Sequence, residues 1–221
     1  RAARGGGVAF IDDDATAREG WATALLSEFD EHPDAVAVAG RVELCFAAGP
    51  PRWFAPRFVS WYSGLDLGAE PMDVAPGQWV VGANLAMRRD EIVRAGGFRD
   101  DLGRRAGTLI GNEELELIDR LRPHGTVRWQ PRAVVDHLVL PDRLQLRWLL
   151  ARAVAQGRSD VRAGGGGDRM SATRGLVAGW RTTARRLRAG PFTEQAIAES
   201  LSRARRLGEV VELSRRPGRR R

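Results

Sequence analysis

Lysine is absent from this chain of 221 residues, and all 35 basic residues are arginine. Beside abundant Ala and Gly, this pattern is more typical of biased codon usage than of a need for guanidinium chemistry at each position. Cysteine is nearly absent, because Cys45 is the only one. A single Cys excludes an internal disulfide framework, the lack of clustered Cys and His argues against a structural zinc site, and a free thiol favours a reducing, cytoplasmic compartment.

Long hydrophobic runs are also missing. No stretch approaches the roughly 18 consecutive apolar residues of a membrane-spanning helix, so we expect no such helix. The chain is nevertheless 43% hydrophobic, which is enough to bury a sizeable core. Its length allows one domain, or one domain with a helical appendage.

Acidic and basic residues are unevenly distributed. Residues 1–142 carry 16 Arg and 22 acidic residues, a net charge of −6, whereas residues 143–221 carry 19 Arg and 6 acidic residues, a net charge of +13. We therefore predict a first domain over 1–142, a basic helical extension over 143–214, and a disordered Arg-rich tail over 215–221.

Hydrophobic periodicity predicts an α/β first part. Alternating or continuous apolar runs indicate strands, and apolar residues at helical spacing indicate helices. The expected strands cover 8–11, 35–44 (one bent strand or a pair), 79–87, 127–129 and 133–137, and the expected helices cover 18–31, 89–95, 111–121, 144–156, 176–187 and 192–211.

The segment 49–78 shows no regular period. It is rich in Pro and in aromatic residues, including Trp53, Phe54 and Trp61. A loop of this length inside a domain is typical of a lid or binding loop. The alternative is an aromatic cluster that stabilises an irregular segment.

Three consecutive carboxylates, Asp12, Asp13 and Asp14, follow the apolar run 8–11. Like charges this close repel each other unless a cation or donor groups compensate them, so a divalent metal is a natural partner. Strand ends are also where open α/β sheets bind ligands. The alternative is a solvated turn before a helix.

Two further groups carry chemistry. Glu113 and Glu114 lie at the expected start of helix 111–121, where acidic residues cap a helix and where a carboxylate can also serve as a general base. His137, one of three His, lies at the end of a strand. Such a His is more often structural than a ligand, unless a metal site is argued independently.

Five motifs in order resemble the family 2 glycosyltransferases, which have the GT-A fold. They are Phe10-Ile11-Asp12-Asp13-Asp14, Gly82-Ala83-Asn84-Leu85-Ala86-Met87-Arg88-Arg89, Gly96-Gly97-Phe98, Gly111-Asn112-Glu113-Glu114-Leu115-Glu116-Leu117 and Val135-Asp136-His137. The resemblance covers roughly residues 1–160. It implies a GT-A-like α/β fold followed by the basic helical region.

The resemblance also implies a reaction. A sugar would move from a nucleotide-diphosphate sugar to a hydroxyl of a glycan or lipid carrier, with inversion and with Mn²⁺ or Mg²⁺ as the cofactor. Asp14 and Asp12 would hold the metal, with His137 as a further ligand, and the cation would neutralise charge on the departing diphosphate. The donor-binding set comprises Asp12, Asp13, Trp79, Gly82 and Asn84.

The catalytic base implied by the resemblance is Glu114 or Glu113. These residues stand where the family has a Glu-Asp pair. The change from Asp to Glu lengthens the second arm by one methylene, which leaves both residues as candidates.

The chain also departs from the family pattern. Family members place a nucleotide-binding half before the Asp motif, and here eleven residues precede Asp12. The resemblance thus implies a GT-A domain without its N-terminal half. If the chain is the entire product, strands 8–11 and 79–87 would lack sheet neighbours. The rival interpretation is an inactive remnant that acts as an interaction module.

The basic helices allow two functions of different class. With Trp148, Trp180 and several Leu beside Arg, they could rest on an anionic membrane surface, peripheral on the inner face of the cell membrane, or they could pack on the first domain. A charge of +13 also suits nucleic acid, but no recognised nucleic-acid motif accompanies it, so that partner is not expected.

Overall fold

The computed structural model describes residues 5–103, 109–164, 173 and 193–215. These form two compact units. The first comprises residues 1–49, 57–99 and 113–140, and the second comprises 50–56, 100–112 and 141–221. The second unit therefore draws in two short segments that the charge distribution did not set apart.

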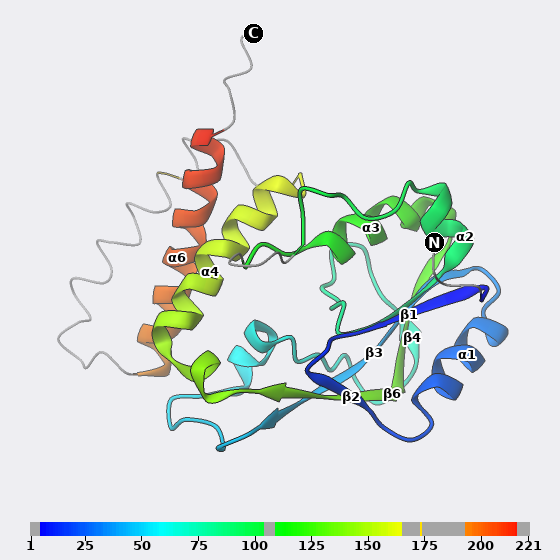
Figure 1. Cartoon of the computed structure of the whole chain (residues 1–221), viewed down its shortest axis with the longest axis horizontal. Helices are drawn as coiled ribbons and strands as arrows, with labels where there is room; N and C mark the ends of the chain where they lie inside the picture. Colours follow the sequence, from blue (N-terminus) through cyan, green and yellow to red (C-terminus); the bar gives the residue numbers. More distant parts are fainter. Residues whose placement is uncertain (1–4, 104–108, 165–172, 174–192, 216–221) are drawn as a thin grey trace, which may run out of the picture. The chain divides into compact units, whose positions relative to one another are not determined.

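The first unit is a mixed sheet with helices, as predicted (Figure 1). Its strands follow the order β1-β5-β3-β6-β2, and β4 pairs with β6. Among the strands of the described residues, β3 and β6 run parallel and the other pairs are antiparallel. The elements are β1 (Gly7–Ile11), β2 (Ala15–Ala17), α1 (Trp21–Glu31), β3 (Ala35–Phe46), η1 (Pro56–Tyr62), β4 (Met72–Asp73), β5 (Asn84–Arg88), α2 (Arg89–Arg94), α3 (Glu113–Leu121), η2 (Arg122–His124) and β6 (Thr126–Val139).

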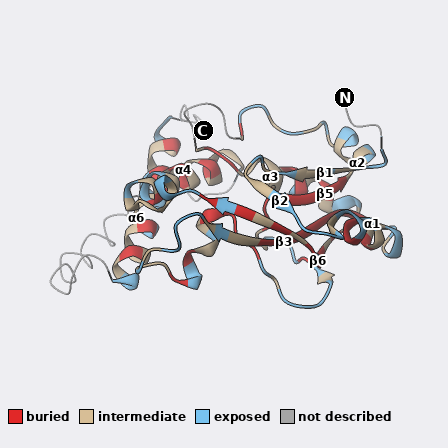
Figure 2. Cartoon of the chain, turned by 60° about the horizontal axis from the view of Figure 1, so that its bottom comes forward, coloured by how far each residue is buried: buried red, intermediate tan, exposed pale blue. Residues whose placement is uncertain are grey.

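Two apolar clusters form on the sheet, and the buried central strands are visible in Figure 2. In one cluster Ala24 and Leu25 of α1 pack with Val38 and Ala86. In the other, Leu117, Ile118 and Leu121 of α3 pack with residues of β3, β5 and β6, among them the fully buried Trp129. Alternation along the strands explains the two sets, because successive side chains point to opposite faces.

Three expectations about strands are corrected. The run 79–87 is strand only from Asn84, because residues 79–83 form a turn and coil that brings Gly82 to α3. The strands expected at 127–129 and 133–137 are one strand, β6, which continues past Pro131 through a register shift against β3. Finally, β5 does not lack neighbours, since it lies between β1 and β3. Among the described strands, β1 pairs on one side only.

Part of the aromatic segment 49–78 is buried in the first unit. Phe58 and Tyr62 of η1 are buried, at 1% and 3% exposure. Burial raises the pKa of Tyr62 to about 12. These two rings are therefore part of the buried core, and both interpretations of segment 49–78 stay predictions.

The second unit contains η3 (Pro141–Leu144), α4 (Leu146–Arg162) and α6 (Glu194–Arg215). α4 and α6 pack side by side (Figure 1) through two glycines. A Cβ on Gly157 would lie 1.8 Å from the carbonyl oxygen of Arg205, and one on Gly208 would lie 1.9 Å from that of Val154. Only Gly lets the two backbones approach this closely.

Several predictions for the basic region change or fall outside the described residues. α4 continues to Arg162 rather than ending at 156, and α6 continues through Arg215, the first residue of the expected tail. The expected helix 176–187 and residues 216–221 lie outside the described residues. No helix in the described ranges is long and apolar enough to cross a membrane.

Candidate metal and sugar-transfer site

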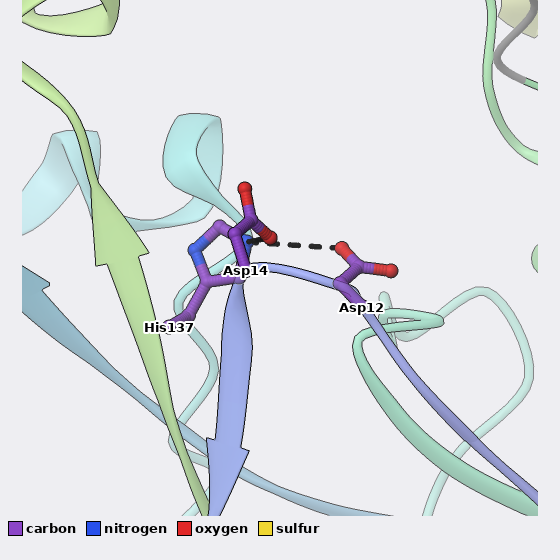
Figure 3. Close-up of side chains that lie close together, drawn as sticks. All are labelled: Asp12, Asp14 and His137. Carbon is purple, nitrogen blue, oxygen red and sulfur yellow. Dashed lines mark ion pairs between the residues drawn. The ribbon is translucent and has the colours of Figure 1, made fainter.

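Two neighbouring carboxylates, Asp12 and Asp14, meet the distant His137 where β1 ends (Figure 3). Asp12 follows β1, Asp14 precedes β2, and His137 lies on β6. One ligand atom from each falls within 4.8 Å of the others. His137 Nε2 is 3.1 Å from an Asp14 carboxylate oxygen and 3.7 Å from one of Asp12.

Backbone pairing explains how these side chains converge. The chain turns at Asp12, whose carbonyl accepts a hydrogen bond from the Ala15 N–H at 3.1 Å. β2 then pairs with β6 so that Ala15 lies opposite His137. The Leu138 N–H also donates to the Asp14 carbonyl, at 2.8 Å. The middle residue, Asp13, is exposed, whereas Asp12 and Asp14 are half-buried.

The imidazole of His137 is buried, at 2% exposure. Neither of its nitrogens has a hydrogen-bond partner of acceptable geometry among the described residues. Buried polar atoms are rarely left without a hydrogen-bond partner, and an imidazole nitrogen beside two carboxylates is a suitable cation ligand. The donor set, two carboxylates and one imidazole, fits Mn²⁺ or Mg²⁺ and does not select between them.

The two glutamates lie at the start of α3. The Gly82 N–H donates a hydrogen bond to Glu114 Oε1 at 3.2 Å. Atom Oε2 of Glu113 is buried without a hydrogen-bond partner in the described part of the chain. Gly82 thus contacts a predicted base, and both glutamates remain candidates for it.

The remaining predicted donor-binding residues lie in the core. Trp79 is half-buried and packs against the α3 side of the sheet. Asn84 is fully buried, and its amide makes three hydrogen bonds to protein groups: its oxygen accepts from Trp21 Nε1 at 2.8 Å, and its nitrogen donates to the carbonyls of Arg41 and Ala133, both at 2.7 Å. Sequence reasoning missed Trp21 and Gly40 as neighbours of Asn84, because only the fold brings them together.

On the opposite face of β6, a second charged group lies near the surface. Arg18 bonds to Asp136 at 2.6 and 2.9 Å and to Glu43 at 2.6 Å. The Arg18 hydrogen bonds hold the pKa of Asp136 below its usual value. Asp136 and His137 are adjacent in sequence but on different faces, so a one-residue shift of β6 would exchange them.

Comparisons with known proteins agree with the motif order. No protein-family model matches the chain. The chain is 31% identical over 154 residues to a glucosyl-dolichyl phosphate glucuronosyltransferase of Haloferax volcanii, covering 69% of this chain and 49% of that protein. It is 33% identical over 156 residues to a pre-mycofactocin glycosyltransferase of Mycobacterium tuberculosis, covering 69% and 30%.

A third relative is the succinoglycan biosynthesis protein ExoM of Rhizobium meliloti, which is 30% identical over 157 residues, covering 70% of this chain and 47% of ExoM. Over the matched region, the chain belongs to the family 2 glycosyltransferases. It spans about half or less of the length of these relatives. A crystal structure of GalNAc-T7 with UDP, GalNAc and Mn²⁺ covers 70% of this chain and 33% of that one, with a TM-score of 0.43 and 12% identity. The family assignment rests on the sequence relatives.

Proposed function

We propose that this chain carries the metal-binding and acceptor-activating part of an inverting glycosyltransferase that uses a nucleotide-diphosphate sugar. The observation that carries the proposal is the convergence of Asp12, Asp14 and a buried His137 without a hydrogen-bond partner among the described residues. A solvated turn would not need a buried imidazole beside two carboxylates. The relatives, all named for glycosyl transfer or glycan biosynthesis, support the same reaction class.

In this proposal, Asp12, Asp14 and His137 hold Mn²⁺ or Mg²⁺. A divalent cation bound there would neutralise negative charge on the leaving diphosphate. Glu114 accepts the proton of an acceptor hydroxyl, whose oxygen then bonds to the anomeric carbon as the bond from that carbon to the diphosphate breaks. The Gly82 N–H, which donates to Oε1 of Glu114, holds this carboxylate in place for the transfer.

The acceptor is proposed as a hydroxyl of a glycan or of a lipid carrier. The printed name of the Haloferax relative contains a dolichyl phosphate, and that of the Rhizobium relative contains succinoglycan. Docking of the basic helices on an anionic membrane surface stays a prediction. Part of the positive charge is used inside the second unit, because Arg158 and Arg162 bond to Glu212 and Arg205 bonds to Asp160.

The decisive experiment is a titration of the chain with Mn²⁺, in which free Mn²⁺ is followed by electron paramagnetic resonance. We expect binding by the parent protein and at least about tenfold weaker binding by Asp14→Asn and His137→Gln. Asp13→Asn is the matched control, because Asp13 is exposed and outside the metal group. Equal binding by all four proteins would contradict the proposed metal site.

Transfer itself is tested with labelled UDP- and GDP-sugars and lipid or glycan acceptors. Glu114→Gln should abolish transfer if Glu114 is the base, with Mn²⁺ binding unchanged. Loss in Glu113→Gln alone would move the role to Glu113. If the parent binds Mn²⁺ and nucleotide but both Gln variants leave its transfer rate unchanged, the proposed base is wrong. If the folded parent neither binds nor transfers, the inactive interaction module is favoured.

A further inference from the structure

We infer that Asn84 is a positioning residue: its amide fixes the register of β6 against β3 and so places His137 beside Asp14. The inference rests on the proposed function only in that His137 is there a metal ligand. It gives Asn84 a different role from the sugar contact implied by the family resemblance.

The first step is the irregularity in the ladder between β3 and β6. Gly40 pairs with Gln130, but the next residue, Arg41, pairs with Val134. Residues 131–133 of β6 therefore have no partner on β3 in this ladder, and one of them is Pro131, which has no N–H. Where a ladder is interrupted, nearby backbone carbonyls need another donor.

The Asn84 amide supplies these donors. Its nitrogen donates one hydrogen bond to the Arg41 carbonyl of β3 and one to the Ala133 carbonyl of β6, both at 2.7 Å. These carbonyls lie on the two strands directly beside the register shift. One planar group thus joins both strands at the point where their pairing resumes.

The orientation of the amide is itself fixed. Trp21 Nε1 donates to Asn84 Oδ1 at 2.8 Å, which assigns the oxygen to the α1 side and the nitrogen to the carbonyls. Gly40 leaves the necessary space, because a Cβ there would lie 2.3 Å from the Asn84 nitrogen and 2.4 Å from the Ala133 oxygen. Asn84 also lies opposite Ile11, the residue before Asp12, in the pairing of β1 with β5.

The register decides which side chain of β6 faces the carboxylates. In the present register Glu43 lies opposite Asp136 and Leu44 opposite His137, so that Asp136 bonds to Arg18 on one face while His137 meets Asp14 on the other. A slip by one residue would turn every side chain of this segment to the other face. His137 would then leave the carboxylates.

The single cysteine allows the register to be measured without any metal. Cys45 is exposed and pairs with Leu138, which is 38% exposed. In the background Leu138→Cys, mild oxidation should join the two thiols in the native register, and a slipped strand would place them on different faces. Thiol alkylation and mass measurement report the cross-linked fraction.

Four further variants are introduced into this background. Asn84→Asp keeps the shape of the side chain but replaces both N–H donors by an oxygen facing two carbonyls, and Gly40→Ala places a methyl where the amide lies. Trp21→Phe is milder, because it removes the donor to Asn84 and part of the ring but leaves both hydrogen bonds of the Asn84 nitrogen in place. Val38→Ala is the matched control: it creates a cavity in the buried cluster that includes Ala133 and packs against Trp21, and it removes none of the hydrogen bonds of the Asn84 amide.

We expect cross-linking in the parent and in Val38→Ala, and at least about tenfold weaker cross-linking and Mn²⁺ binding in Asn84→Asp and Gly40→Ala, with Trp21→Phe between. Equal cross-linking in all folded variants would overturn the inference, as would its absence in the parent. If Asn84→Asp does not fold, Trp21→Phe and Gly40→Ala decide. If the cross-linking pattern holds but no protein binds Mn²⁺, the proposed metal site fails and the register role of Asn84 stands.

Discussion

Arginine bonds to carboxylates in both units of this chain, as Arg128 does to Glu28 in the sheet unit, but the groups that it joins differ. In the sheet unit, Arg88 donates to the carbonyls of Phe29, Pro33 and Ala35, and Arg120 donates to those of Ala95 and Gly97. These guanidinium groups satisfy backbone carbonyls where α1 and α2 end and β3 begins. These arginines therefore stabilise the ends of helices and the start of a strand.

In the helical unit, arginine meets carboxylates. Arg158 and Arg162 bond to the two oxygens of the buried Glu212, at 3.0 and 2.8 Å, and Arg205 bonds to Asp160 at 2.7 Å. These pairs join α4 to α6. The comparison teaches that arginine forms ion pairs in both units, but only those of the second unit join two closely packed helices, so a change of packing or charge there should affect mainly the helix pair.

The largest effect is expected where the helices touch. Gly157→Ala places a methyl within van der Waals radius of the Arg205 carbonyl, and the resulting overpacking should lower the free energy of unfolding of the helix pair by about 3 kcal/mol. Amide hydrogen exchange should become faster in α4 and α6, and it should change less in the central strands. The exposed Ala151→Val, on the same helix, is the control. Equal acceleration in β3 and β5 would contradict separate cores.

The next effect is a loss of helix pairing in acid. Burial raises the pKa of Glu212, but its hydrogen bonds with Arg162 and Arg158 outweigh burial and lower it overall. A carboxyl with a lowered folded-state pKa stabilises the fold above its unfolded value of about 4.5, and this contribution is lost as the pH falls through the folded value. We expect about 1–2 kcal/mol of the stability of the helix pair to disappear below pH 4.5.

Denaturant melts between pH 3 and 7 measure that loss. Glu212→Gln should already be destabilised at pH 7 and should show a weaker dependence on pH. Glu209→Gln, one turn earlier on α6, should follow the parent. If Glu212→Gln had the same pH dependence as the parent, the ion pairs of Glu212 would not be the cause of the loss of stability in acid.

In the sheet unit a further pH effect is expected at the alkaline end. Burial raises the pKa of Tyr62 to about 12, so the unfolded state ionises first above pH 10. A raised pKa makes stability fall between pH 10 and 12, here by up to about 2 kcal/mol. Tyr62→Phe should lose most of this fall in alkaline denaturant melts, while Tyr absorbance reports the ionisation. A normal titration of Tyr62 in the folded protein would contradict the expectation.

The smallest effect is expected for the exposed ion pairs of the sheet. Arg18→Ala removes bonds to Asp136 and Glu43, but Arg18 is 44% exposed and salt screens such pairs. The free energy of unfolding should fall by less than about 1 kcal/mol, and the difference should shrink at high salt. Melts at low and high ionic strength measure it. If Arg18→Ala lowered the free energy of unfolding more than Glu212→Gln does, the exposed ion pairs would matter more than the buried ones, contrary to the expectation.

Sequence by itself determined the local features of this protein. A continuous apolar run located β1, apolar patterns located β3 and two parts of β6, helical patterns located α1 and α3, and the order of motifs identified the family. The residues Asp12, Asp14 and His137 could be named because carboxylates after an apolar strand indicate a cation and the family pattern added the imidazole. These signals lie within a few residues or in a fixed order along the chain.

Tertiary structure alone decided what depends on register and on contacts between distant segments. It made 126–139 one strand with a shift at Gly40, and it enclosed Asn84 among Trp21, Arg41 and Ala133. It also placed Gly157 and Gly208 against the backbone of the opposite helix. The physical reason is that hydrogen bonds and close packing depend on distances in space, which neither the composition nor the period of a segment specifies.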